Sequence, residues 1–180
     1  MKKLTSILLL TCILATLLFT GCSSDGDAQT FASAVDALNA VWNNYDENLK
    51  FPCYGGTFEK SVDNAPGTFP LSDTASAGNI ILNDKLLGQV SDAASLFHMM
   101  NANTFTGVAV KVTGDKSAFV SNLKSAILGF QFVCGAPEKL CIITVGDYVI
   151  YSFGFSDIVD PFETAAKKIK GAKVEVSQLF

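Results

Sequence analysis

The stretch Leu140–Phe155, LCIITVGDYVIYSFGF, contains two apolar, β-branched runs that are separated by a Gly-Asp pair. Short apolar runs of this composition are typical of buried strands. Glycine at position 146 adopts without strain the positive φ angle that a two-residue hairpin turn requires. The sequence therefore predicts an antiparallel β-hairpin that turns at Gly146 and Asp147.

A strand and a helix are predicted before this hairpin. The valines of TGVAVKVT, residues 106–113, alternate with other residues, which indicates a strand. Asp115 is then the expected N-cap of a helix that runs to about Phe130 and has an apolar stripe at helical spacing. The upstream segment thus adds one strand and one helix to the hairpin.

A helix and a strand are also predicted after the hairpin. Asp160 is followed by Pro161 and, three residues on, by Glu163, a combination that favours a helix start at this point. Gly171 is expected to end that helix. The alternating valines of AKVEVS, residues 172–177, indicate the last strand.

The predicted order from Thr106 onward is strand, helix, strand, strand, helix, strand. This is the split βαβ order of ferredoxin-like sandwiches. In such a fold two helices pack on one face of an antiparallel sheet. We therefore expect an α+β protein with a ferredoxin-like unit from about Thr106 and with extra helices before it.

The region before this unit is predicted to hold two helices and a long loop. Residues 30–45 place their apolar side chains on one helical face, and residues 91–100 read as a second helix with Ser91 as its N-cap. Residues 46–71 are rich in proline and glycine and are expected to form a loop of unusual length. Residues 79–88 are compatible with either a short helix or an extended segment.

The N-terminal segment has the organisation of a bacterial export signal. Lys2-Lys3 forms a short positive region, and the apolar run of residues 4–20 is slightly short for a membrane span. The run ends in Leu18–Cys22, LFTGC, which resembles the lipobox of bacterial lipoproteins, with Phe19 where leucine is more usual. The resemblance implies that Cys22 receives a diacylglycerol and becomes the new N-terminus.

Three parts of the chain follow from this interpretation. Residues 1–21 are the expected lipoprotein signal peptide, residues 22–29 a flexible tether rich in serine, glycine and aspartate, and residues 30–180 a single domain. Two acyl chains hold a protein stably on a bilayer, whereas one holds it only marginally. The expected location is the extracytoplasmic face of the cell membrane, where the protein is held through its N-terminal lipid.

The charge balance argues against nucleic acid as a partner. The chain has 13 lysines, no arginine and 17 acidic residues, and removal of residues 1–21 leaves 11 lysines against 17 carboxylates, a net charge of −6. Arginine is the usual ligand of phosphate groups, and cationic contacts supply most of the affinity for nucleic acid. We therefore expect no nucleic-acid binding, and we expect membrane attachment to depend on the lipid.

The segment from Ser91 to Lys170 resembles a family of small lipoproteins of Gram-positive anaerobes that is known only as a domain of unknown function. The matching features are the strand GVAVKV, the helix SAFVSNLKSAI, the hairpin LCIITVGDYVIYSF and a final helix. The chain departs from the family pattern because its central helix lacks an arginine. The resemblance implies an exported, anchored α+β domain and implies no particular activity.

Three cysteines remain once Cys12 is removed with the signal peptide and Cys22 is lipidated. Cys53, Cys134 and Cys141 allow three single bridges, and the alternative is that they are buried thiols. We favour Cys134–Cys141, because that bridge closes a short loop between a helix and a strand. The spacing is not C-x-x-C, so thiol redox catalysis is not expected.

The only histidine, His98, is followed by Met99 and Met100, a set of ligands that suits copper. Consecutive residues of a helix point in different directions, so these three side chains are not expected to converge on a metal. A serine hydrolase triad would also require His98, and no serine sits in a strained nucleophile turn. We therefore expect no enzyme, no metal site and no cofactor.

The sequence leaves two functions open. The leading expectation is a non-enzymatic binding or interaction module at the cell envelope, with a protein or envelope component as its partner. The alternative is binding of a small ligand or metal in a groove formed by Cys53, Tyr54 and His98, with the region 53–69 as its wall.

Overall fold

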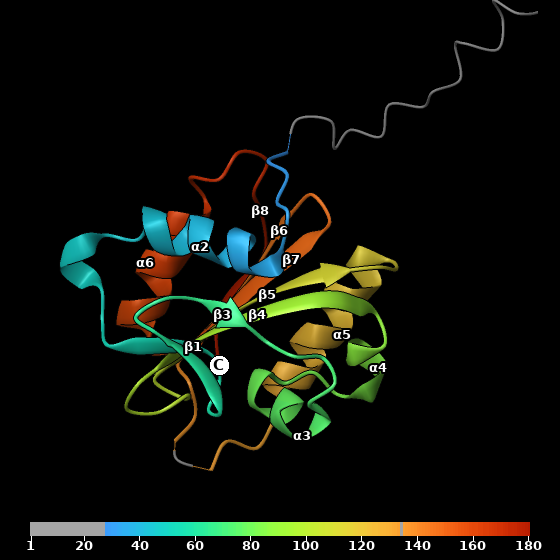
Figure 1. Cartoon of the computed structure of the whole chain (residues 1–180), viewed down its shortest axis with the longest axis horizontal. Coiled ribbons are helices and arrows are strands. Elements are labelled where there is room, and N and C mark those ends of the chain that lie inside the picture. The colour runs from blue at the N-terminus through green and yellow to red at the C-terminus, as the bar shows by residue number, and fades with distance from the viewer. Residues whose placement is uncertain (1–27, 134) are drawn as a thin grey trace, which may run out of the picture.

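The computed structural model describes residues 28–133 and 135–180, which form an antiparallel sheet with helices on both faces (Figure 1). The strands are β1 (Cys53–Thr57), β2 (Lys60–Asp63), β3 (Gly67–Thr68), β4 (Val90–His98), β5 (Phe105–Val112), β6 (Lys139–Val145), β7 (Tyr148–Gly154) and β8 (Lys173–Leu179). The helices are α2 (Ala34–Asn44), α3 (Thr74–Ala77), α4 (Asp84–Leu87), α5 (Lys116–Leu128) and α6 (Ser156–Ala166), with 3-10 turns η1 (Glu47–Leu49) and η2 (Gly78–Ile80). The described part of the chain therefore has the predicted α+β class.

The predicted hairpin and the helix that precedes it are confirmed. β6 and β7 pair antiparallel with Val145 opposite Tyr148, and Gly146 adopts φ 52° in the turn between them. α5 begins directly after Asp115, whose carboxylate accepts hydrogen bonds from two N–H groups of the first helical turn. Local sequence signals thus determine both elements.

The ferredoxin-like arrangement of the strands is not confirmed. The sheet runs in the order β2-β1-β4-β5-β7-β6-β8, and the short strand β3 pairs with β4 beyond the end of β1. In a ferredoxin-like unit the last strand returns to lie beside the first, which would place β8 next to β5. Here β4 occupies that place, and β8 pairs with β6 at the edge of the sheet.

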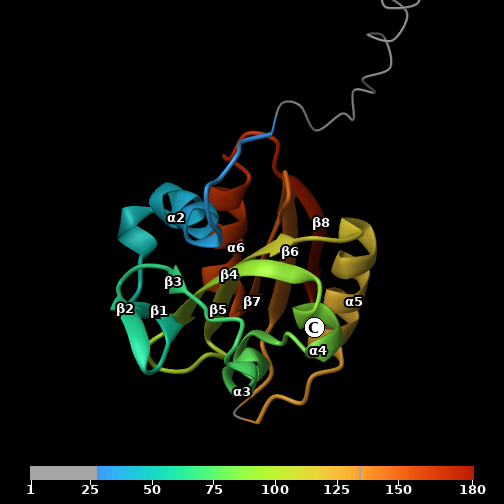
Figure 2. The same ribbon diagram turned by 45° about the vertical axis from the view of Figure 1, so that its right-hand side comes forward.

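The two crossover helices lie on opposite faces of the sheet, and not on one face as predicted (Figure 2). α5 joins β5 to the parallel strand β6, and α6 joins β7 to the parallel strand β8. Both crossovers move in the same direction across the sheet, but they start from antiparallel strands. Nearly all crossover connections between parallel strands are right-handed. Two right-handed crossovers that move in the same direction but start from antiparallel strands must pass over opposite faces of the sheet.

Each face of the sheet has its own apolar core. α2 and α6 cover one face, where Trp42, Phe105 and Phe162 are buried. α5, α4 and η2 cover the other face, where Phe119 and Tyr151 are buried. The central strands β4, β5, β6 and β7 are therefore buried on both sides.

The predicted helix over residues 91–100 is wrong: residues 91–98 belong to strand β4, Met99 and Met100 follow the strand, and Ser91 is not an N-cap. β4 lies between β1 and β3 on one edge and β5 on the other. Ala93 packs in one core and Ala94 in the other, so the segment shows no polar alternation. A strand that is buried on both faces does not alternate apolar and polar residues, so this alternation cannot identify it, which explains the wrong prediction.

The predicted long loop, residues 46–71, contains the three strands β1, β2 and β3. The chain folds so tightly here that a Cβ atom on Gly55 would overlap the backbone of Gly67. Ser95 of β4 binds the backbone of Gly56 in β1. Its hydroxyl donates to the carbonyl of Gly56 (2.8 Å) and accepts from the amide of Gly56 (3.0 Å). Because these contacts involve backbone atoms, the pattern of apolar residues does not predict them.

α6 begins at Ser156, one turn before the predicted start at Asp160 and Pro161. The amide of Ser156 donates to the carboxylate of Glu138 (3.0 Å), which satisfies one of the free N–H groups at this end of the helix. Pro161 therefore lies inside the helix. The last strand, β8, is confirmed.

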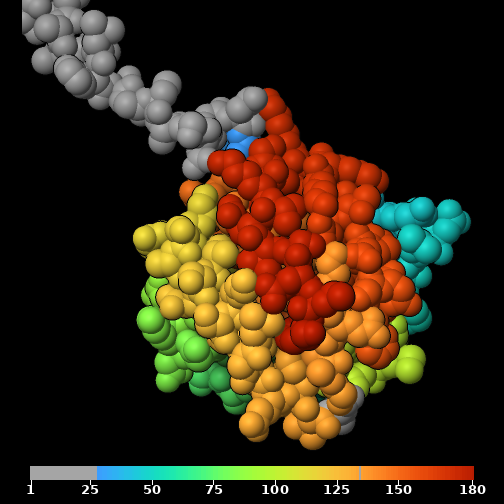
Figure 3. All heavy atoms as spheres, turned by 180° about the vertical axis from the view of Figure 1, so that it is seen from behind, coloured from blue at the N-terminus to red at the C-terminus, as the bar shows by residue number. Residues whose placement is uncertain are grey.

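β8 is an open edge of the sheet and lies between α5 and α6 on the back of the molecule (Figure 3). Its pairing with β6 is irregular at Glu175, because Val174 and Val176 face consecutive residues of β6. Glu175 accepts a hydrogen bond from the hydroxyl of Thr144 (2.8 Å). A bulge and charged side chains on an edge strand oppose pairing with a further strand.

Candidate functional site

The structure places the three residues of the predicted groove on two different faces of the sheet. Cys53 and His98 are directly opposite each other on β1 and β4. Cys53 is buried in the core under α2 and α6. Tyr54, the next residue along β1, packs instead against the other core, with its ring 5.3 Å from the ring of Phe97. Cys53 and His98 are therefore neighbours, and Tyr54 does not join them.

His98 is held by the residues around it. Its ring stacks on Phe51 with 5.1 Å between ring centroids and an interplanar angle of 13°, and its Nδ1 accepts a hydrogen bond from the amide of Met100 (3.1 Å). Burial lowers the pKa of His98, which favours the neutral imidazole. Within the described residues, no group of three or more His, Cys, Asp or Glu side chains is arranged to hold a metal ion.

The described cysteines are buried thiols. Burial raises the pKa of Cys53 to about 11, and burial followed by the charge of Glu163 raises the pKa of Cys141 to about 12. Thiolates are the nucleophilic form, so neither sulfur suits nucleophilic chemistry near neutral pH. Cys22 and Cys134 lie outside the described residues, so lipidation of Cys22 and the bridge from Cys134 to Cys141 stay predictions.

A polar cluster joins α6 to β6 and β8. Glu163 accepts hydrogen bonds from Lys139 (2.9 Å) and Ser177 (2.7 Å) and forms an ion pair with Lys167, while Lys139 also pairs with Asp160. Burial alone would raise the pKa of Glu163, but the hydrogen bonds from Lys167, Lys139 and Ser177 outweigh burial and lower that pKa to about 2. A carboxylate with such a pKa is poorly matched to acid–base catalysis near pH 7.

Sequence reasoning missed this cluster. Glu163 and Lys167 are four residues apart on one helix, and that spacing was the available local signal. Lys139 and Ser177 reach Glu163 from strands that become neighbours only when β6 and β8 pair. The cluster is consistent with a structural role, because its charges are paired and it fixes α6 on the edge of the sheet.

The hollows of the surface do not coincide with the predicted groove. One of about 400 Å³ lies between α6 and β8, beside Lys139 and Ser177. Another of about 350 Å³ lies between α2 and α6, and a third of about 280 Å³ lies beside Lys111 and Tyr148. None of these three hollows is lined by Cys53, Tyr54 or His98.

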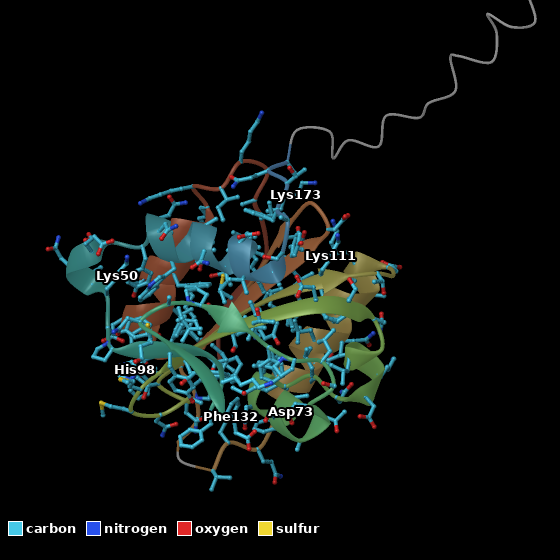
Figure 4. All side chains as sticks on the ribbon, viewed as in Figure 1. Lys50, Asp73, His98, Lys111, Phe132 and Lys173 are labelled. Carbon is cyan, nitrogen blue, oxygen red and sulfur yellow. The ribbon has the colours of Figure 1, made fainter. Side chains whose placement is uncertain are left out.

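The two ends of the sheet have different surfaces. We call the near end the one where the described chain begins: the amide of Gln29 donates to the carbonyl of Lys170 (2.9 Å), beside the turn at Gly146. We call the far end the one that holds loop 99–104, Phe155 and the C-terminus. Figure 4 shows Lys111 and Lys173 toward the near end, and His98 and Phe132 toward the far end.

Exposed apolar side chains gather at the far end. Its backbone segments are joined by hydrogen bonds from Phe155 to Thr104 (2.9 Å) and from Phe180 to Glu138 (3.0 Å). The far-end group of exposed apolar residues is Met99, Met100, Phe130, Val133, Phe155, Leu179 and Phe180. Val174 belongs to the near end, and the other large exposed apolar side chains of the described residues, Leu49, Phe58, Val62 and Leu128, lie outside the far-end group. Exposed apolar groups that cluster in this way mark interaction surfaces.

Comparison with known proteins gives no relative for this chain. No family model, no curated protein and no solved structure matches it. Within residues 28–133 and 135–180, no helix has the length and apolar character to cross a membrane.

Proposed function

We propose that this chain is a lipoprotein that is anchored through Cys22 at the extracytoplasmic face of a bacterial cell membrane. Its domain binds a protein or another component of the envelope and catalyses no reaction. The partner contacts the far-end group. The anchor itself is inferred from the positive residues, the apolar run and the LFTGC motif of the N-terminal segment.

The observation that supports an interaction role is the polarity of the domain. The described chain begins at the near end, and seven of the twelve large exposed apolar side chains among the described residues lie at the far end. Met100 and Val133 are 84% and 93% exposed, so a partner that covered them would gain the free energy of burying their apolar surface. A partner at the far end would meet the side of the domain that is remote from the anchor.

Site-specific photo-crosslinking in cells tests this proposal. A photoreactive amino acid replaces Met100 or Leu179 at the far end, and in the matched control it replaces Ser121, which is exposed on the side of α5. The proposal expects the same crosslinked product from Met100 and Leu179 and no such product from Ser121. Equal products from all three positions, or none from the far-end positions, would contradict it.

The alternative, binding of a small ligand or metal beside Cys53 and His98, has less support. The region 53–69 is filled by the three strands β1, β2 and β3, and the backbones of β1 and β3 touch at Gly55 and Gly67. His98 already stacks on Phe51. A thermal-shift panel of transition metals and small apolar ligands would revive this alternative if any member raised the melting temperature.

A further inference from the structure

We propose that Met99 and Met100 form a methionine oxidation site that controls binding at the far end. A peroxide converts both thioethers to sulfoxides, and the oxidised far end releases its partner. The release rests on the proposed function, because it needs a partner that covers the far-end group. The inference adds the residues through which that binding is regulated and the chemical class of the agent that acts on them.

The first argument is the place of the methionines. The chain has three, and Met1 belongs to the expected signal peptide, so Met99 and Met100 would remain after processing. Methionine commonly fills gaps in apolar cores. Here Met99 and Met100 are 56% and 84% exposed, and no methionine is buried in the part of the chain that the structure describes. The two thioethers are therefore adjacent in the far-end group, where a dissolved oxidant can reach them.

The second argument is that the described cysteines do not compete for the oxidant. Cys53 and Cys141 are buried, and their pKa values are raised to about 11 and about 12, so both stay protonated thiols near neutral pH. Peroxides attack thiolates, and they attack only those that are accessible. A thioether has no such proton to lose, so it reacts without a change of protonation state. The oxidant should therefore act on the methionines of the folded domain before it acts on these thiols.

The third argument is that the backbone beneath the two methionines is held in place. The amide of Met99 donates to the carbonyl of Pro52 (3.0 Å), and the amide of Met100 donates to Nδ1 of His98 (3.1 Å). These hydrogen bonds involve main-chain atoms of the methionines and leave their side chains outside both apolar cores. Oxidation of the side chains should therefore change the surface without unfolding the domain.

The oxidation uses hydrogen peroxide or an organic peroxide as its only co-reactant. A lone pair of the thioether sulfur attacks one oxygen of hydrogen peroxide, so that an S–O bond forms and the O–O bond breaks. The hydroxide that leaves takes the proton of the transferred hydroxyl group and becomes water. Sulfur is oxidised to the sulfoxide, and the peroxide is reduced. A thiol-dependent sulfoxide reductase restores the thioether, so the site can act as a reversible switch.

The effect on binding follows from the change in polarity. A thioether is apolar and adaptable at a binding surface, whereas a sulfoxide is polar. A partner that covers the far-end group would have to bury the sulfoxide oxygens, and burial of a polar group without a hydrogen bond is unfavourable. The other side chains of the group are hydrocarbons, so Met99 and Met100 are its oxidisable part. We expect oxidation to weaken binding about tenfold.

Residue-resolved mass spectrometry tests the site itself. The processed chain with Cys134→Ser is treated with hydrogen peroxide in native buffer and in concentrated urea, and fragment ions distinguish Met99 from Met100. We expect each methionine to gain one oxygen at a rate within a few-fold of its rate in urea, with Met100 the faster, and the melting temperature to stay unchanged. Oxidation that requires urea, or that unfolds the domain, would contradict the inference.

A matched set of variants tests the effect on binding. A photoreactive amino acid at Leu179 reports the partner in membranes of the producing cells, before and after treatment with peroxide. In the parent chain, peroxide should reduce the crosslinked product about tenfold. Met99→Leu combined with Met100→Leu stays apolar and cannot be oxidised, so it should keep the product. Met99→Gln combined with Met100→Gln imitates the polarity of the sulfoxides and should give little product without peroxide. Thermal melting checks that both double variants fold.

The outcomes distinguish this inference from the proposed function. If Leu179 gives a crosslinked product that peroxide does not reduce, the switch is wrong and the interaction role stands. If the product falls equally in the parent and in the double leucine variant, the loss does not come from the methionines and the switch is again wrong. If the untreated parent gives no product, the interaction role fails and the switch falls with it.

Discussion

Oε2 of Glu163 on α6 lies 2.9 Å from Nζ of Lys139 on β6. This pair joins a helix to a strand of the sheet, and the Glu163 side chain is only 8% exposed. Because its partners stabilise the charged form, the pKa of Glu163 is lowered from 4.5 to about 2. A group with a lowered pKa stabilises the folded state above its unfolded pKa and loses that contribution as pH falls.

The first prediction is that stability decreases as pH falls from about 5 toward 2, with Glu163 responsible for up to about 3 kcal/mol. Glu163→Gln should lower the free energy of unfolding at pH 7 by a similar amount and flatten its pH dependence. Urea denaturation at pH 7 and pH 3 measures both effects. The exposed control Glu59→Gln should behave like the wild type, and parallel pH profiles for Glu163→Gln and the wild type would contradict the prediction.

The second prediction concerns Ser95, whose buried hydroxyl satisfies both backbone groups of Gly56. Ser95→Ala leaves a buried amide and a buried carbonyl without this partner, so it should destabilise the fold by about 2 kcal/mol. Ser91→Ala, at an exposed position of the same strand, should cost less than about 0.5 kcal/mol. Chemical denaturation compares the two variants, and equal losses of stability would show that the buried hydroxyl has no special role.

The third prediction concerns the close approach of Gly55 and Gly67. A Cβ on Gly67 would lie 2.6 Å from the carbonyl carbon of Gly55, so Gly67→Ala should destabilise by about 3 kcal/mol, the upper part of the range for overpacked sites. Gly78 has no heavy atom within 4 Å of an added Cβ and has φ −59°. Gly78→Ala should therefore stabilise by about 0.5 kcal/mol. If Gly67→Ala and Gly78→Ala changed the melting temperature in the same direction and by a similar amount, the proposed contact would be contradicted.

The fourth prediction is that the buried thiols are inert in the folded protein. In a Cys12→Ser, Cys22→Ser and Cys134→Ser background, Cys53 and Cys141 should react with a thiol-specific disulfide reagent only as the protein unfolds. The pKa values of about 11 and about 12 leave almost no thiolate at pH 8. Rapid reaction of either thiol in native buffer, at the rate seen in denaturant, would show that the site is open.

The parts of the fold that depend on local signals could be predicted from the sequence. The turn at Gly146, the N-cap at Asp115 and the last strand are confirmed. Strand β4 was not recognised because Ala93 and Ala94 are both buried, on opposite faces, so no period-two pattern marks the strand. Its alanines and serines also suit a helix, and only pairing with β5 decides between the two.

The order of the strands could not be predicted, because it depends on pairing between distant segments. The place of β8 beside β6, and not beside β5, puts α6 on the opposite face from α5. The candidate site could not be predicted for the same reason, because it also depends on pairing between distant segments. Cys53 and His98 become neighbours only when β1 pairs with β4, and the alternation of β1 turns Tyr54 away from them.

Mass spectrometry of the N-terminal peptide from the membrane fraction of the producing cell measures lipid attachment at Cys22 itself. We expect a peptide that begins at Cys22 and has the added mass of a diacylglyceryl group, with or without an amide-linked acyl chain. An unmodified chain that still begins at Met1 and is recovered in the soluble fraction would contradict it.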